Sequence, residues 1–131
     1  MSERQKAPIV RIAELARQRG IKLVGLQLPF IRSGVRFLDE DESYQDNAGV
    51  WREFESDRTR HWLKSLGITF FDLGRSPIGD DSRNFVDAYH TTDLGAARAV
   101  KELLASPEFR AVLPAIDPAD IDRQIDRLKP E

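Results

Sequence analysis

The hydrophobic positions at the start of the chain change from a helical spacing to a strand-like one. Apolar residues at positions 9, 12, 13 and 16 predict one buried face of a helix over residues 8–19. Gly20 follows and is a typical residue to end a helix. Residues 21–28 are then almost continuously apolar and stop at Pro29, so we expect a strand buried on both faces, as in parallel sheets.

The next segment repeats this order of elements. Residues 30–43 predict a long connection, with a short edge strand at 35–38. A second helix is expected from about Gln45 to Leu66, because tryptophans and other apolar residues recur along one stripe, and Gly67 ends it. β-branched and aromatic residues at 68–73 predict a second buried strand.

The C-terminal third is predicted to be helical after one loop. Residues 75–85 are rich in Gly, Pro, Ser and Asp and are expected to form this loop. Thr92 is a good N-cap for a helix that stops before Pro107. Residues 107–131 then form a helical extension, whose last amphipathic helix begins at Asp117.

This order of elements predicts a single α/β domain over residues 1–131, corresponding to half of a doubly wound parallel sheet. Two parallel strands leave two open edges and do not make a stable sheet alone. We therefore expect the remaining strands to come from a longer polypeptide, a partner or a second copy of the chain. The other possibility is a strand that the sequence pattern does not reveal.

Composition removes several function classes. The 131 residues carry a net charge of -2 with basic and acidic residues interspersed, which argues against nucleic-acid binding. The absence of cysteine excludes disulfides, thiolate metal sites and a cysteine nucleophile. No apolar run approaches the roughly 18 residues that span a bilayer. The polar N-terminus shows no signal peptide, so a cytoplasmic location is the default, although an upstream segment would leave the location open.

One pair of residues has the spacing of a catalytic base and its orienting group. Asp87 lies three residues before His90 in the loop that precedes the Thr92 cap. A carboxylate at this spacing can accept the Nδ1–H of the imidazole, which fixes the tautomer and leaves Nε2 free as a general base. In open α/β sheets such groups gather beyond the carboxyl ends of strands, where residues 27–30 and Asp72 are also expected.

Two other interpretations involve titratable residues. His61 is expected to be a partly exposed helix residue, because no acidic partner is placed for it by the local sequence. A metal site is the other chemical possibility, although most of its acids are also explained as turn or helix-start residues. Its candidate ligands are Asp72, Asp80, Asp81, Asp87, His90 and Asp93.

The stretch 85–97 resembles the last conserved block of the SGNH (GDSL-type) hydrolases, in which Asp-x-x-His is followed by a few residues, a Gly and a helix. The similarity covers roughly residues 8–106, and the Asp-x-x-His block is its most specific part. The resemblance implies a flavodoxin-like, three-layer α/β/α fold. It also implies a Ser–His–Asp triad that acts on acyl esters, including acetyl groups on polysaccharides, with His90 as general base and Asp87 as its orienting group.

The chain departs from that family where the nucleophile is concerned. The family's Gly-Asp-Ser motif and its oxyanion-hole residues lie before the matched regions and are not found upstream here. Gly79-Asp80-Asp81-Ser82 looks similar, but the extra Asp and the position just before Asp87 make it a loop. Ser33 has no better claim than Ser82. A histidine base without a nucleophile cannot perform acyl transfer.

Two functional hypotheses follow. In the first, the chain is the C-terminal part of an SGNH-type ester hydrolase or O-acyltransferase that needs no cofactor or metal. It is inactive alone, pairs with a missing N-terminal segment, and acts on a small acyl ester or an acylated saccharide. In the second, it is a truncated, non-catalytic α/β module that acts through self-association, as a homo-oligomer, or through partner binding.

Overall fold

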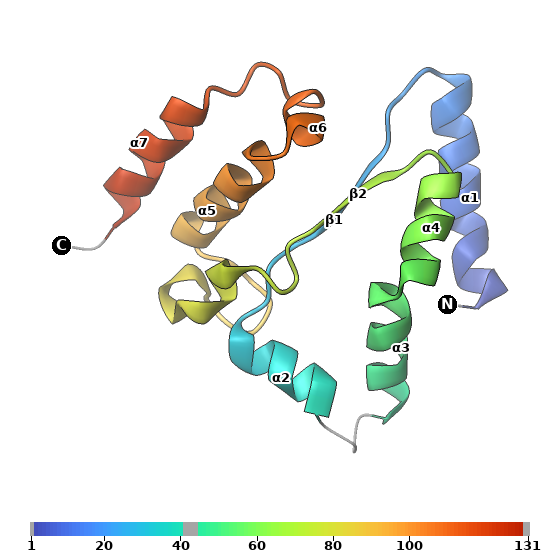
Figure 1. Cartoon of the computed structure of the whole chain (residues 1–131), viewed down its shortest axis with the longest axis horizontal. Coiled ribbons are helices and arrows are strands. Elements are labelled where there is room, and N and C mark those ends of the chain that lie inside the picture. The colour runs from blue at the N-terminus through green and yellow to red at the C-terminus, as the bar shows by residue number, and fades with distance from the viewer. Residues whose placement is uncertain (1, 41–44, 130–131) are drawn as a thin grey trace. The chain divides into compact units, whose positions relative to one another are not determined.

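The computed structural model describes residues 2–40 and 45–129, the latter with side chains from residue 49 onward (Figure 1). Its elements are α1 (Glu3–Gln18), β1 (Val24–Gln27), α2 (Arg32–Glu40), α3 (Gln45–Glu55), α4 (Asp57–Ser65), β2 (Thr69–Asp72), the 3₁₀ helices η2 (Pro77–Asp80) and η3 (Ser82–Asn84), α5 (Asp93–Leu104), α6 (Pro107–Arg110) and α7 (Pro118–Leu128). The chain is therefore of the α/β class, as the sequence pattern predicts.

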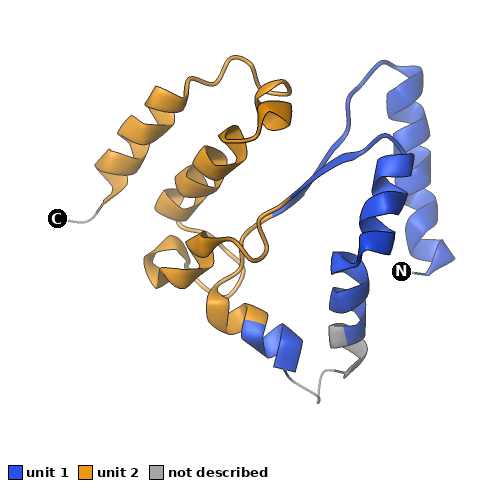
Figure 2. Ribbon diagram, in the orientation of Figure 1, with its two compact units in different colours: residues 1–27, 36–71 blue, residues 28–35, 72–131 orange. Residues whose placement is uncertain are grey.

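Contacts within the chain divide it into two compact units (Figure 2). Unit 1 comprises residues 1–27 and 36–71, and unit 2 comprises residues 28–35 and 72–131. The Asp87–His90 loop and the C-terminal helices all belong to unit 2, so the geometry of the candidate site is described within that unit.

In unit 1, helix α1 begins earlier than its apolar pattern predicts. Ser2 and Gln5 form a capping box in which each side chain satisfies the other residue's backbone N–H, with the Ser2 amide 2.8 Å from Gln5 Oε1. Gly20 ends the helix region with a φ of +66°, as expected for a C-terminal glycine. The buried face of α1 contributes Ala13, which packs with Leu63 and Ile68.

The prediction of one helix over 45–66 is wrong, because the chain breaks between α3 and α4 at Ser56. The Ser56 hydroxyl accepts the Thr59 amide and donates to the carbonyl of Glu53 at 2.6 Å. Thr59 Oγ1 donates to the same carbonyl at 2.7 Å. These local side-chain bonds replace the continuous helical ladder and start a new helix. Gly67, with a φ of +77°, ends α4 as predicted.

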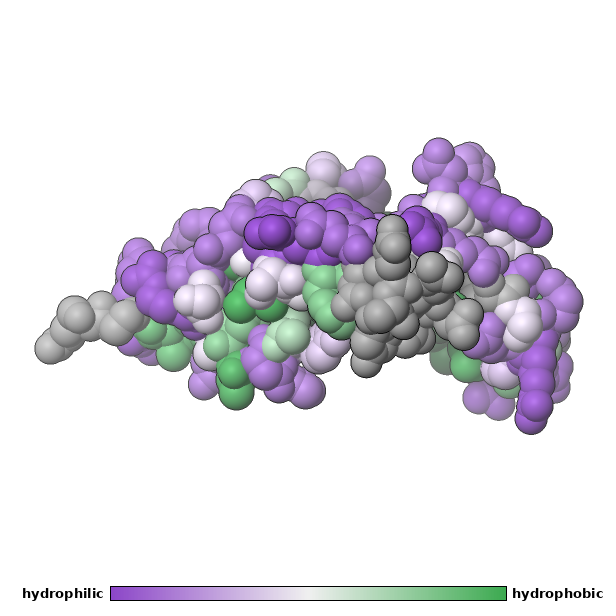
Figure 3. Space-filling model, turned by 90° about the horizontal axis from the view of Figure 1, so that it is seen from below, coloured by the Kyte–Doolittle hydropathy of each residue, from purple (hydrophilic) through white to green (hydrophobic). Residues whose placement is uncertain are grey.

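The sheet consists of β1 and β2, which are parallel neighbours. Leu26 of β1 is 41 % exposed, and Ile21 just before the strand is 55 % exposed. The expectation that this strand is buried on both faces is therefore wrong for the described chain, because no packed layer among the described residues covers these side chains. Apolar residues also reach the surface on the face drawn in Figure 3.

The predicted edge strand at 35–38 is instead part of helix α2, which replaces most of the predicted connection; residues 41–43 of that connection lie outside the described residues. The carbonyl of Ile31 accepts the amides of Gly34 and Val35 at 2.9 and 3.1 Å and opens the helix. Ile31, Val35 and Leu38 are spaced i, i+4 and i+7, a helical signal, and Val35 is only 2 % exposed. Pro29, which is fully buried, lies between β1 and this helix.

In unit 2, α5 and α7 share one small core. Leu94 and Ala97 of α5 pack with Ile125 of α7, and Ile121 and Leu128 lie against them. The predicted caps are confirmed, because the side chains of Thr92 and Asp117 accept backbone amides at the starts of α5 and α7. Of the helices in the described part of the chain, none has the length and apolar character needed to cross a bilayer.

Candidate functional site

The segment that carries the candidate base is a hairpin-like loop before α5. Phe85 and Thr91 form an antiparallel bridge, and the Val86 amide donates to the carbonyl of His90 at 2.8 Å. The residues between them are therefore held in a tight turn at the surface of unit 2. This turn brings Asp87 next to His90, as their spacing predicts.

The Asp87 carboxylate holds the His90 ring. Its Oδ1 accepts the backbone amides of Tyr89 and His90, each at 2.9 Å, and its Oδ2 lies 2.7 Å from His90 Nδ1. The Tyr89 amide first, and then the His90 ring and amide, lower the pKa of Asp87 to about 2. An ionised carboxylate can only accept, so Nδ1 must carry the proton and the neutral ring keeps its lone pair on Nε2.

The Nε2 side of the ring faces solvent. The His90 side chain is 77 % exposed, and within the described residues Asp87 is its hydrogen-bond partner. Ser82 at the start of η3 and Ser33 in α2 are exposed, and neither makes a described hydrogen bond to His90. Ser43 lies outside the described residues. This part of the chain thus presents an oriented base without a hydroxyl placed to give it a proton.

A buried asparagine at the end of η3 anchors the loop. Asn84 is 1 % exposed, its Nδ2 donates to the carbonyl of Ile78 at 2.9 Å, and its Oδ1 accepts from Arg98 Nη1 at 2.6 Å. Its backbone carbonyl accepts the Thr92 amide at 2.9 Å. The sequence pattern did not single out Asn84, because a polar residue in a Gly- and Ser-rich loop carries no periodic signal of burial. It did not single out Arg98 either, because a charged helix residue shows no sign in the sequence of its distant partner.

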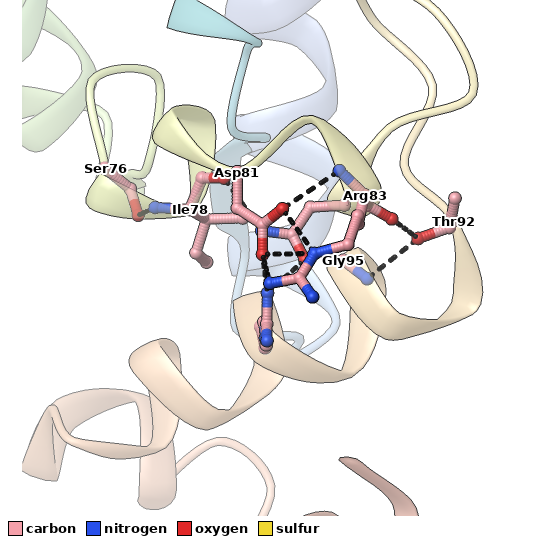
Figure 4. Close-up of polar contacts among 8 residues, drawn as sticks. Ser76, Ile78, Asp81, Arg83, Thr92 and Gly95 are labelled. Atoms are coloured by element: carbon pink, nitrogen blue, oxygen red, sulfur yellow. Dashed lines mark hydrogen bonds and ion pairs between the residues drawn. The ribbon is translucent and has the colours of Figure 1, made fainter. Parts of the chain in front are cut away.

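Two residues at the start of α5 complete this anchor (Figure 4). Thr92 Oγ1 donates to the carbonyl of Arg83 at 2.9 Å and accepts the Gly95 amide at 3.2 Å. Gly95 lies directly against the Asn84 backbone, where a Cβ would overlap the carbonyl oxygen. The glycine that the sequence places after the Asp-x-x-His block therefore allows close approach of α5 to the loop.

Of the acids that the sequence offered as metal ligands, Asp80 and Asp81 are bound to arginines, Asp72 and Asp87 close turns, and Asp93 lies in the first turn of α5. Asp81 accepts from Arg83 at 2.8 Å and from Arg98 at 2.9 Å, and these two guanidinium groups hold its pKa well below the usual range. Asp80 pairs with Arg32 at 2.7 Å. Across residues 2–40 and 45–129, no three His, Cys, Asp or Glu side chains are grouped so that they could hold a metal ion.

Within unit 2, the segment that follows β1 contacts the loop that carries the candidate base. The Phe30 ring meets the Tyr89 ring edge-on, with centroids 5.7 Å apart, and the Phe30 amide donates to the carbonyl of Gly74 at 3.4 Å. Asp72, which was also expected near the carboxyl ends of the strands, accepts the Gly74 amide at 2.9 Å and closes the turn after β2. The Phe30–Tyr89 contact thus joins residues 28–35 to the loop that carries His90.

His61, the second histidine, has a different environment. It is exposed on α4, and its Nδ1 lies 2.7 Å from the backbone carbonyl of Asp57, one turn earlier in the same helix. A carbonyl orients the ring but supplies no negative charge to stabilise an imidazolium. The helix-residue interpretation of His61 agrees with this geometry.

No protein-family model matches this chain, and no curated protein or solved structure matches it either. The resemblance of residues 85–97 to the SGNH block remains a hypothesis from sequence. The geometry of Asp87, His90 and their supports is the evidence on which a function can be proposed.

Proposed function

We propose that this chain supplies the base half of an SGNH-type ester hydrolase or O-acyltransferase. His90 is the general base and Asp87 orients it, while the serine nucleophile and the oxyanion donors come from a segment outside this chain. The observation that carries the proposal is the 2.7 Å bond between His90 Nδ1 and an Asp87 carboxylate with a lowered pKa. This arrangement suits the tautomer and the charge that a serine-activating histidine needs.

The proposed chemistry is acyl transfer in two steps. A serine hydroxyl gives its proton to His90 Nε2 as its oxygen bonds to the acyl carbon, and Asp87 stabilises the resulting imidazolium. Cleavage of the ester C–O bond then releases the alcohol, which takes the proton from Nε2. Water or a second alcohol, activated by the same nitrogen, finally removes the acyl group from the serine.

The sheet supports pairing with another segment. Leu26 of β1 is 41 % exposed, and the described sheet has two strands, so a segment that adds strands and a packed layer would complete it. A flavodoxin-like sheet completed in this way would bring a strand-end serine to the carboxyl ends of the strands, where the active groups of such folds gather. The expected substrate is a small acyl ester or an acylated saccharide, and no cofactor is needed.

The test compares the chain alone with the chain in its natural context. The protein is tagged at its C-terminus in its own cell and purified with any polypeptide that precedes or accompanies it. The purified material is assayed with p-nitrophenyl acetate. We expect turnover that falls at least 100-fold in His90→Ala and is retained in His61→Ala, since general-base removal has effects of roughly this order. The isolated 131-residue chain should show only the background of free imidazole.

His61→Ala is the matched control, because both rings are exposed and both have Nδ1 bound to an oxygen, but only His90 is bound to a carboxylate. Turnover that survives in His90→Ala, or material from the native context with no esterase activity on this ester or on acetylated saccharides, would refute the proposal.

The second candidate function is a non-catalytic module that binds a partner or a second copy. The exposed apolar residues of unit 1, including Ile12 at 56 % and Ile21 at 55 %, favour it. In that case the complex forms equally well with the His90→Ala variant, and no serine in the complex has a reactivity that depends on His90. The same purified material therefore distinguishes the two candidates.

A further inference from the structure

The loop that carries His90 is closed at its base by one buried residue. All the polar groups of Asn84 are bonded: its amide donates to the carbonyl of Asp81 at 3.0 Å, its carbonyl accepts Thr92, and its side chain bridges Ile78 and Arg98. Residue 84 precedes the Phe85–Thr91 bridge and residue 92 follows it. The Asn84–Thr92 bond thus sets the separation of the two ends of the loop.

Arg98 holds Asn84 from helix α5. Its Nη1 donates to Asn84 Oδ1 at 2.6 Å and to Asp81 Oδ2 at 2.9 Å, and its side chain is 26 % exposed. Thr92 caps the same helix, so α5 holds the loop at two points, one by its capping residue and one by Arg98 less than two turns later. Gly95, between them, gives the helix room to lie against the Asn84 backbone.

The Asp87–His90 pair needs such support because packing does not hold it. The side chains of Asp87 and His90 are 53 % and 77 % exposed, and exposed ion pairs exchange partners with water readily. What keeps Oδ2 at Nδ1 is the shape of the loop backbone, which also supplies two amides to Oδ1. That backbone is set by the closure at Asn84.

We infer that Asn84 and Arg98 are positioning residues for the base: through the partly buried Asn84–Arg98 bond, α5 fixes the loop in which Asp87 selects the Nδ1–H tautomer of His90. The geometric claim stands on the contacts of unit 2. Its catalytic use rests on the proposed function, in which Nε2 must be unprotonated to accept the proton of a serine.

The test reads the tautomer directly by ¹⁵N NMR of the histidine side chains at a pH where the rings are neutral. The chain has two histidines, so His61 is an internal reference. We expect His90 to be predominantly Nδ1–H in the unmodified chain. In Arg98→Gln and Asn84→Ala this preference should be lost, with a shift toward the Nε2–H tautomer that free histidine favours, while His61 does not change.

Arg83→Gln is the matched control variant. Arg83 and Arg98 bind the same Asp81 carboxylate, as Figure 4 shows for Arg83, but the Arg83 side chain is 65 % exposed and its guanidinium has no described bond to Asn84. Both variants remove one positive charge next to Asp81. We expect Arg83→Gln to keep the His90 tautomer. The inference is overturned if Arg83→Gln and Arg98→Gln lose the Nδ1–H preference of His90 equally. It is also overturned if Arg98→Gln and Asn84→Ala both retain that preference.

A measurement on the unmodified chain covers the case in which the variants do not fold. If Asn84 closes the loop, the Thr92 amide should exchange with solvent as slowly as the Ala96 amide, which lies inside α5 and donates to the Thr92 carbonyl at 2.8 Å. Exchange of Thr92 at the rate of an open loop overturns the inference.

Failure of this inference and failure of the proposed function give different results. If the Nδ1–H tautomer of His90 depends on Arg98 but the native complex hydrolyses no ester, the proposed function is refuted and the positioning role stands. If ester hydrolysis by the complex depends on His90 but the tautomer of the His90 ring does not depend on Arg98 or Asn84, only the positioning role is refuted.

Discussion

At the scale of single residues, Asp87 and Asn84 differ in how far the sequence reveals them. Asp87 and His90 are three residues apart in a turn, so their contact is local and could be predicted from spacing. Asn84 and Arg98 are separated by 14 positions, and their bond exists only because α5 returns against η3. A lone sequence contains no signal for that return, and for this reason the orienting acid was predicted while its support was not.

The first prediction concerns the titration of Asp87. Its pKa of about 2 lies below the ordinary value of 3.8, so its bonds stabilise the folded loop above about pH 4, and this stabilisation is lost as the pH falls through 2. We expect the ¹³C-carboxyl shift of Asp87 to titrate near pH 2. In His90→Ala the midpoint should rise only in part, because the Tyr89 amide, the largest cause, remains. A midpoint near 4 in the unmodified chain would show that the carboxylate is not held as described.

At the scale of elements, capping residues decide where the helices begin and end, and therefore where the boundaries predicted from the apolar pattern are correct. The ends at Gly20 and Gly67 and the starts at Thr92 and Asp117 agree with the sequence, because each depends on one residue with a specific backbone role. The break at Ser56 and the helix α2 were missed. In both places a helical stripe was present, but its limits are set by local hydrogen bonds that compete with the apolar pattern.

The second prediction compares two helix glycines. Gly95→Ala should destabilise the protein by about 1–3 kcal/mol, the usual range for overpacking, because its Cβ would overlap the Asn84 carbonyl. Gly49→Ala in α3 adds a Cβ that meets nothing within 4 Å and should stabilise by about 0.5–1 kcal/mol. Urea unfolding curves measure both. Equal effects of the two substitutions would mean that α5 does not lie against η3.

The third prediction concerns the cap between α3 and α4. Ser56→Ala removes the acceptor for the Thr59 amide and should destabilise the protein by about 1 kcal/mol, the typical effect of a lost N-cap. Ser65→Ala is the control, since Ser65 donates to the Trp62 carbonyl near the end of α4 and caps no N-terminus. A Ser56→Ala protein as stable as the unmodified one would indicate that α3 and α4 form one helix.

At the scale of the whole molecule, the sheet is the part that the described residues leave unfinished. Two strands give little cooperative stability, and β1 leaves the apolar side chain of Leu26 at the surface. The α/β class could be predicted from the alternation of helix and strand patterns. What completes the sheet could not, because that depends on residues that do not belong to β1 or β2.

The fourth prediction follows from this unfinished sheet. The isolated chain of 14.9 kDa should self-associate in sedimentation-velocity experiments, because its strand edges and Leu26 remain uncovered. Leu26→Lys should shift the distribution toward the monomer. Val86→Lys, at a 74 % exposed loop position, should leave it unchanged. A single monomeric species for the unmodified chain contradicts the prediction.

The central claim, that His90 activates a serine supplied from outside this chain, is tested most directly by covalent labelling. Material purified from the native context is treated with a fluorophosphonate, and the modified residue is identified by mass spectrometry. The account predicts one labelled serine on the preceding or accompanying polypeptide, with labelling that is lost in His90→Ala and retained in His61→Ala. Absence of any labelled serine, or labelling that is independent of His90, would contradict it.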